Sequence, residues 1–194
     1  LNWARVTQMP IVDEAFLLKI GRYITPSPSE SLAARKILTN TQSYPARMEM
    51  IEETDRRNQI LIISKGWGYS FKDLPNGLRQ IVDFVLPGDF CGLESVFVSG
   101  PGLNFASITR VVAASISSQS LLAVSRQCPR LGGAILWSAS LGGSIVAERL
   151  ITLGRRSAAA RVAHLLLELS VRLEFIGQGD SSGFFCPLTQ HDLA

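Results

Sequence analysis

The sequence predicts an α+β fold in which an antiparallel barrel or jelly roll of short strands is followed by a long helix and further helices. Three observations predict it. Short strand-like segments recur at intervals of roughly 8–12 residues between turn signals, which is typical of such barrels. A mostly uncharged stretch then begins at Pro129, which suits the first position of a helix because its missing N–H costs nothing there. Near the end, Thr189 is a good N-cap and Asp192 places a carboxylate beside the free N–H groups of a first helical turn.

The elements of the barrel follow from strand and turn patterns. Residues 59–64 form a strand candidate, and residues 78–86 alternate as a second strand. Asn76-Gly77 marks the turn before that second strand, because this pair accepts positive φ angles. Pro87-Gly88-Asp89 marks another turn, and one or two further strands are expected over 105–117.

Helices are predicted on both sides of the barrel. Apolar spacing and capping residues indicate two helices before it, the second capped by Ser29, and three after it. Gly154 is expected to end the long helix, and Ser157 to open the next. The predicted helical ranges are 11–24, 32–38, 120–126, 129–153 and one from 157, and a polar loop over 177–183 then leads to a short strand over 184–187.

Composition limits the class of protein. Hydrophobic residues make up 46% of the 194 residues and charged residues 18%, which indicates a globular chain rather than a disordered one. The net charge of +3 permits nucleic-acid binding without arguing for it. Three distant cysteines without a CxxC pair argue against a disulfide framework and against a zinc or iron–sulfur site, so we expect a cytoplasmic setting. No signal peptide is visible, and the uncharged stretch 131–147 falls short of the roughly 20 apolar residues of a spanning helix, so we expect a buried helix and no membrane.

Five short motifs occur in a definite order: Ser64-Lys65-Gly66-Trp67, then residues 76–81, 86–93, 154–163 and 187–194. Together they resemble the Crp/Fnr family of bacterial transcription regulators, over roughly Arg47 to Ala194. The resemblance implies a sensory barrel of the cyclic-nucleotide-binding type with N-terminal helices over 1–128. A dimerisation helix would follow over 129–153, and the start of a winged helix-turn-helix over 154–194.

The resemblance also implies a homodimer that binds double-stranded DNA in its full-length form. The recognition helix, which lies in the major groove in such proteins, would follow Ala194, so the given chain is not expected to recognise DNA sequence. Thr189 and Gln190 match positions near the phosphate backbone, where contacts position the protein. The alternative is a ligand-binding module without DNA-reading activity. A third hypothesis, a cupin-type enzyme, lacks metal ligands within the barrel, because His164 and His191 both follow it.

The site that would hold a cyclic nucleotide is degenerate. Ligand-binding relatives carry a glutamate for the ribose and an arginine for the phosphate, because a buried phosphate needs a paired cation and donors. Here Leu93 and Phe105 stand near those places, and Arg110 lies too far along. We therefore predict no tight binding of cyclic AMP and no metal or other cofactor; a less charged small-molecule effector is one alternative, and ordinary turn glycines at Gly88 and Gly92 are another. The residues of this degenerate cradle are Gly92, Leu93, Glu94, Ser95, Asn104, Phe105 and Ala106.

The long helix carries small residues four apart, at Ala139, Gly143 and Ala147, which would let two helix backbones approach closely. Packing against the chain's own barrel is the alternative. The expected dimer-helix positions are Leu131, Ile135, Ser138, Gly142, Ile145 and Arg149.

Two other features have both a functional and a structural interpretation. The basic residues Arg149, Arg155, Arg156 and Arg161 form either a solvated cluster or a contact to DNA phosphates or a sister subunit. Cys91 is expected to be a buried, inert thiol rather than a redox sensor.

Overall fold

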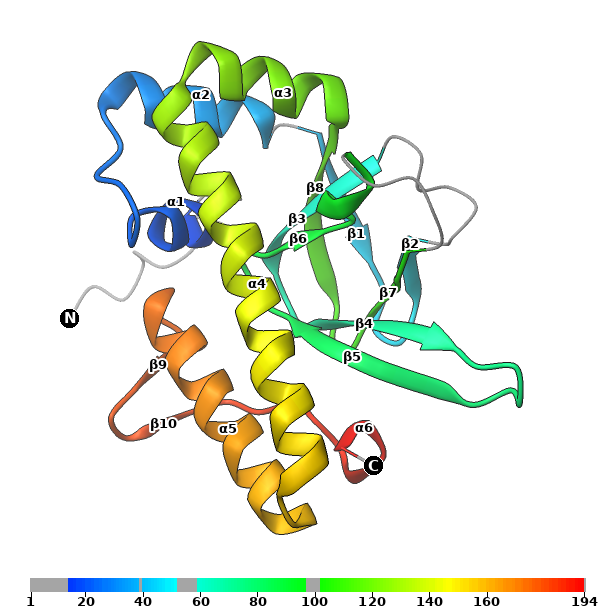
Figure 1. Cartoon of the computed structure of the whole chain (residues 1–194). Helices are drawn as coiled ribbons and strands as arrows, with labels where there is room; N and C mark the ends of the chain where they lie inside the picture. Colours follow the sequence, from blue (N-terminus) through cyan, green and yellow to red (C-terminus); the bar gives the residue numbers. More distant parts are fainter. Residues whose placement is uncertain (1–13, 39, 52–58, 97–101, 194) are drawn as a thin grey trace, which may run out of the picture.

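The computed structural model describes residues 14–38, 40–51, 59–96 and 102–193, and it contains two facing antiparallel sheets flanked by helices (Figure 1). The strands are β1 (Thr41–Tyr44), β2 (Glu49–Ile51), β3 (Gln59–Lys65), β4 (Gly68–Asp73), β5 (Arg79–Val85), β6 (Phe90–Cys91), β7 (Asn104–Ser107) and β8 (Val111–Ser117). One sheet has the order β1-β8-β3-β6 and the other β2-β7-β4-β5. The predicted strands over 59–64 and 78–86 are confirmed, and the stretch 105–117 forms two strands.

Strand β3 is buried on both faces, which explains its unbroken apolar sequence. Leu61 and Ile63 point into the space between the two sheets, where they meet Phe105 and Val111. The alternate residues Ile60 and Ile62 belong to a second cluster formed with the helices on the outer face. Successive side chains of a strand point to opposite faces, so a central strand covered on both sides needs apolar residues throughout.

Four helices contribute to that outer cluster: α1 (Glu14–Ile20), α2 (Pro28–Ile37), α3 (Ser118–Gln127) and α4 (Pro129–Arg155). The predicted first helix is shorter than expected, and residues 11–13 of it lie outside the described part. The second helix begins earlier than predicted, because Ser27 rather than Ser29 is its N-cap. The Ser27 hydroxyl accepts from the Glu30 N–H at 3.2 Å, and the Glu30 carboxylate accepts from the Ser27 N–H at 2.7 Å, which completes a capping box.

Helix α4 runs through Gly154 and ends at Arg155, so the prediction that Gly154 ends it is wrong. Gly154 has a helical neighbour on each side, and the helix ends where Arg156 adopts an extended backbone. Ser157 then caps α5 (Ala158–Phe175) as predicted, accepting from the Ala160 N–H at 3.4 Å. Helix α5 lies beside the second half of α4, and its buried Leu169 and Leu173 pack against barrel residues (Figure 1).

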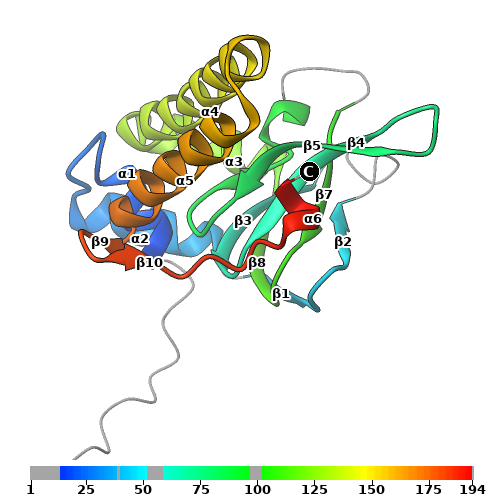
Figure 2. The ribbon, with the colours of Figure 1, turned by 90° about the horizontal axis from the view of Figure 1, so that it is seen from below.

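The C-terminal segment passes beneath the barrel to a short helix, α6 (Gln190–Leu193) (Figure 2). Before it, a hairpin joins β9 (Gly179–Asp180) to β10 (Gly183–Phe184), so the strand expected over 184–187 is limited to its first residue. Asp192 accepts from the Thr189 N–H at 2.8 Å, as the predicted helix start requires. Arg47, in the turn between β1 and β2, donates from Nη2 to the same carboxylate at 3.0 Å and thereby ties α6 to the barrel.

Gly77 and Gly142 both have room for a side chain, but only Gly77 has a backbone conformation that requires glycine. Gly77 has a φ of 81°, and a Cβ placed there would meet nothing within 4 Å. Gly142, inside α4, is equally open.

We expect Gly77→Ala to lower the free energy of unfolding by about 1 kcal/mol, because an L side chain disfavours positive φ. Gly142→Ala should raise it by about 0.5–1 kcal/mol, because alanine is the better helix former. Urea unfolding at pH 7 measures both, and shifts of the same sign would contradict this account.

Candidate functional site

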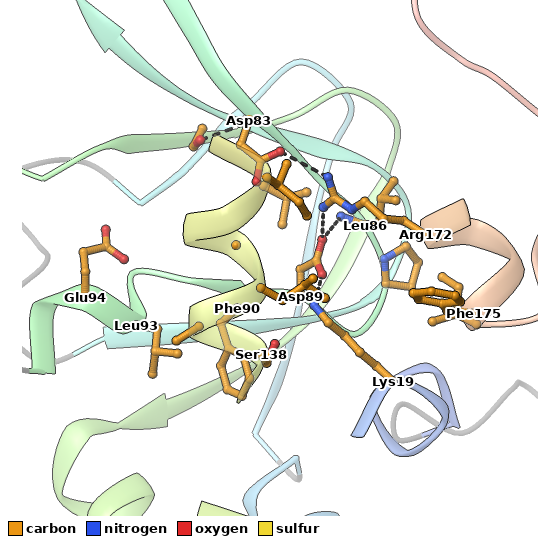
Figure 3. Close-up of a pocket in the computed structure, with 18 of the residues that line it drawn as sticks. Lys19, Asp83, Leu86, Asp89, Phe90, Leu93, Glu94, Ser138, Arg172 and Phe175 are labelled. Atoms are coloured by element: carbon orange, nitrogen blue, oxygen red, sulfur yellow. Dashed lines mark hydrogen bonds and ion pairs between the residues drawn. The ribbon is translucent and has the colours of Figure 1, made fainter. Parts of the chain in front are cut away.

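A cavity of about 310 Å³ lies where the barrel, α4 and α5 meet (Figure 3). Apolar side chains make up most of its wall, with a charged cluster at one end. The barrel contributes Ser70, Asp83, Val85, Leu86, Pro87, Asp89, Phe90, Leu93, Glu94 and Phe105; α1 contributes Lys19; α4 contributes Leu136, Ser138, Ala139, Leu141, Gly142 and Ile145; α5 and its C-cap contribute Arg172, Phe175 and Ile176.

Three residues of the predicted cradle line this cavity: Leu93, Glu94 and Phe105. The other four are near it but are engaged elsewhere. Ser95 donates from its hydroxyl to the Gly92 carbonyl at 2.7 Å, Asn104 lies 3.4 Å from the Asp73 carboxylate, and Ala106 is buried in the sheet.

The turn glycines of the cradle have ordinary structural roles. Gly88 and Gly92 adopt φ angles of 87° and 78°. A Cβ at Gly88 would lie 2.9 Å from the carbonyl oxygen of Ala15, so this glycine lets α1 approach the turn. The Gly88 N–H also donates to the Ile63 carbonyl at 2.7 Å, and it is therefore already used. Arg110 is exposed and donates to Ser43 at 3.1 Å, away from the cavity.

The cations that line the cavity are both bound to Asp89. Lys19 on α1 forms an ion pair with this carboxylate, and Arg172 on α5 donates to it from Nη2 at 2.7 Å (Figure 3). The Leu86 N–H adds a third donor at 2.7 Å. Burial by itself would raise the pKa of Asp89, but Lys19 and Arg172 outweigh it and hold that pKa below its usual value.

Arg172 is the centre of a larger network. Its guanidinium also donates to Asp83 at 3.1 Å, to Glu168 at 2.9 Å and to the Phe84 carbonyl at 2.8 Å, while its side chain is only 12% exposed. Burial lowers the pKa of Arg172, but Asp89, Asp83 and Glu168 together raise it above the usual value, so this residue stays charged. Arg149 on α4 closes the network through two hydrogen bonds to Glu168, at 3.0 and 2.7 Å. Three cations and three carboxylates thus neutralise one another across α1, the barrel, α4 and α5.

Sequence reasoning missed this network, although one signal pointed to it. Arg172 interrupts the apolar face of α5, between the buried residues Leu169, Leu173 and Ile176. A charge on a buried helix face needs a partner, and that requirement predicts a distant carboxylate. The partner itself, Asp89, belongs to the predicted turn Pro87-Gly88-Asp89, and nothing in that motif indicates a contact with α5.

The expected dimer-helix positions lie on the side of α4 that faces the chain's own interior. Leu131, Ile135 and Ser138 are at most 7% exposed, Gly142 and Ile145 line the cavity, and Arg149 belongs to the ion network. Leu131, Ile135 and Ser138 are therefore covered within one chain, whereas Gly142, Ile145 and Arg149 are only partly buried, and a contact of these positions with a partner stays a prediction. The opposite face of α4 is exposed, and it carries Gly143, Ala147, Leu150 and Ile151. Leu136 and Ala139 are exposed as well, but they line the edge of the cavity.

Thr189 and Gln190, the expected DNA-backbone contacts, are both exposed at the start of α6. The hydrogen bond from Arg47 lowers the pKa of Asp192, in the same short helix, to about 2. Arg155, Arg156 and Arg161 are also exposed and surround the junction between α4 and α5, whereas Arg149 is held inside.

Other candidate sites contribute little among the described residues. No group of three or more metal-ligating side chains occurs there. Cys91 is buried, and burial raises the pKa of its thiol well above the usual value, which fits an inert thiol. Helix α4 is long and apolar enough to cross a membrane by length and composition alone. Only 17% of its apolar window is buried, so the expectation of a buried helix is wrong.

The fold is a barrel domain of two facing antiparallel sheets, with a long helix and a cavity on one side. A sequence model described as the cyclic nucleotide-binding domain matches residues 41–128. The transcriptional activatory protein AadR of Rhodopseudomonas palustris is 26% identical over 78% of this chain and 62% of AadR. The nitrogen fixation regulation protein FixK of Bradyrhizobium diazoefficiens is 31% identical over 75% of this chain and 60% of FixK. The solved structure of FixK2 from Bradyrhizobium japonicum superimposes with a TM-score of 0.67 at 25% identity, covering 79% of this chain and 74% of FixK2.

Residues 41–128 form a domain of the cyclic nucleotide-binding type, and over most of its length the chain is similar to regulators of the Crp/Fnr family. The chain spans 60–62% of the length of the curated relatives named above. Those relatives are regulators of transcription rather than enzymes.

The ion network makes a prediction about stability. Arg172→Met keeps much of the side-chain volume but leaves buried carboxylates without their cation, so we expect a loss of about 3–5 kcal/mol in the free energy of unfolding at pH 7. Because Arg172 holds the pKa of Asp89 below its unfolded value, its contribution is complete above that value, near pH 4, and fades as the pH falls through the folded value. Urea unfolding at pH 7 and pH 3 tests this, with the exposed Arg161→Met as the control. An equal loss at both pH values would contradict it.

Proposed function

We propose that this chain is the sensory and dimerisation part of a homodimeric transcription regulator that binds double-stranded DNA in the cytoplasm. The observation that carries the proposal is the position of α5, the helix that leads into the expected DNA-binding head. Its Arg172, Phe175 and the following Ile176 form part of the cavity wall. A change of occupancy in the cavity would therefore act on the head helix directly. The names and functions of AadR and FixK support the same conclusion.

The exposed face of α4 supports a homodimer. Leu150 and Ile151 are 65% and 57% exposed, and the small residues Gly143 and Ala147 share this side of the helix. A long row of exposed apolar and small residues is unusual for a monomer surface and is typical of a surface that another chain covers. Two-fold symmetry would then place two DNA-binding heads on an inverted repeat.

The effector differs from cyclic AMP in this proposal. A cyclic phosphate needs a free cation, whereas Lys19 and Arg172 are both committed to Asp89. The bulk of Phe105, which is buried at the cavity wall, further opposes an anion.

The dimer is tested by a matched pair of variants. We expect Leu150→Glu, at a position 65% exposed on α4, to shift the chain from dimer to monomer at micromolar concentration, because it places a charge in the apolar interface. Leu78→Glu, at a position 63% exposed on the distant β4–β5 hairpin, should leave the dimer intact. Light scattering measures both masses. A monomeric wild type, or a Leu150→Glu dimer, would remove the proposed interface.

DNA binding is tested by selection from random duplex DNA with the chain extended to its natural C-terminus. We expect enrichment of an inverted repeat whose half-sites lie about one helical turn apart, because the two heads are related by a two-fold axis. The Leu150→Glu variant should lose the repeat and retain at most single half-sites. If the wild type enriches no sequence with or without a candidate effector, a ligand-binding module without DNA-reading activity becomes the better account.

A further inference from the structure

The cavity is in contact with three parts of the molecule at once. Leu93 belongs to the barrel, Ile145 to α4, and Phe175 to α5. Phe175 also contacts Arg22, which lies outside the cavity wall and places its guanidinium 4.3 Å from the centre of the Phe175 ring. A molecule bound in the cavity would therefore bridge the barrel, the long helix and the head helix.

Ser138 provides a hydrogen-bonding group in this mostly apolar space. It is 7% exposed and lines the cavity, and its hydroxyl makes no hydrogen bond to any residue that the structure describes. Ser140 and Ser144 on the same helix behave differently, since each donates to the carbonyl oxygen four residues earlier, at 2.9 and 3.2 Å. A hydroxyl that lines the cavity and has no protein partner can form a hydrogen bond with a ligand that carries a donor or acceptor.

The charges around the cavity are already matched. An anionic ligand would have to separate Arg172 or Lys19 from Asp89 and leave that buried carboxylate without a cation. Glu94 lies apart from the cluster, at the other end of the cavity, and is exposed (Figure 3). A pair between Glu94 and a ligand cation would be weak, because water screens exposed charges. An uncharged ligand meets neither obstacle.

We propose that the cavity binds an uncharged, largely apolar small molecule with one hydrogen-bonding group, and that its binding holds α5 against the barrel. The role of α5 as the head helix rests on the proposed function given above. A ligand that contacts Phe175 and Ile176 only while α5 is docked binds the docked state more tightly, and it shifts the population towards that state. Release of the head would weaken ligand binding by the same factor.

Calorimetry with four probes tests the charge preference. The probes are the uncharged 1-naphthol, the anions 1-naphthoate and cyclic AMP, and the cation 1-naphthylmethylammonium. We expect 1-naphthol to bind at least about tenfold more tightly than each charged probe, because only the charged ones disturb the matched cluster or lose their hydration without a buried partner.

Variants of α4 locate the binding. Gly142→Leu should abolish binding of 1-naphthol, because a Cβ at Gly142 meets nothing within 4 Å and a leucine there fills the cavity. Ser144→Leu, at an exposed position of the same helix that does not line the cavity, is the matched control and should bind as the wild type does. Ser138→Ala should weaken the binding of 1-naphthol by about three- to tenfold, as expected for one lost hydrogen bond. The affinity for naphthalene, which cannot form this bond, should not change.

Hydrogen exchange measures the effect on α5. We expect 1-naphthol to slow amide exchange over residues 158–175 in the wild type and not in Gly142→Leu. Tighter or equal binding of a charged probe, no binding of 1-naphthol, binding that survives in Gly142→Leu, or unchanged exchange in α5 would each overturn the inference. None of these readouts uses DNA, so a failed DNA selection with positive probe results removes only the proposed function, and the reverse outcome removes only this inference.

Discussion

The buried contact between Arg172 and Asp89 is the interaction on which the arrangement of this protein depends. The guanidinium comes from α5 and the carboxylate from the turn before β6, so the pair forms only when the helix is docked on the barrel. Neither charge is stable in this environment alone, because removing a buried ion from water is expensive unless a partner replaces the lost hydration. Lys19, Arg149, Asp83 and Glu168 complete a neutral cluster around the pair. The same contact fixes the position of α5 and the shape of one end of the cavity.

The apolar core explains why this docking leaves one surface unfinished. One cluster fills the space between the sheets, a second lies between β3 and the helices, and a third joins α5 to the barrel end near Trp67. All three are satisfied within one chain, since their members are largely buried. The outward face of α4 has no such cover from the residues that the structure describes, and Leu150 and Ile151 remain exposed there. The protein therefore has a complete interior and an incomplete outer helix face.

The helix α4 shows how far sequence patterns reach. Helical periodicity correctly groups Leu131, Ile135 and Ser138 on one face, because residues three and four apart lie side by side. It does not say whether that face meets the chain's own barrel or a second subunit, and the structure assigns it to the barrel. The prediction of the cradle was likewise correct for local residues but did not identify the distant element that they meet. Leu93 and Phe105 line the cavity as expected, but the cavity also extends to α5, which no motif indicates.

The sequence by itself determined the local features: the turn at Gly77, the cap at Ser157, the bond from the Thr189 N–H to Asp192, and the apolar run of β3. Each depends on residues within a few positions, so short-range sterics and hydrogen bonding suffice. Only the tertiary structure decided that Arg172 meets Asp89 and that Arg47 meets Asp192, across 83 and 145 residues. Such pairs leave no local pattern in the sequence, because a charged residue on a buried face implies a partner without indicating which residue it is. The partner is determined only when folding brings distant segments together.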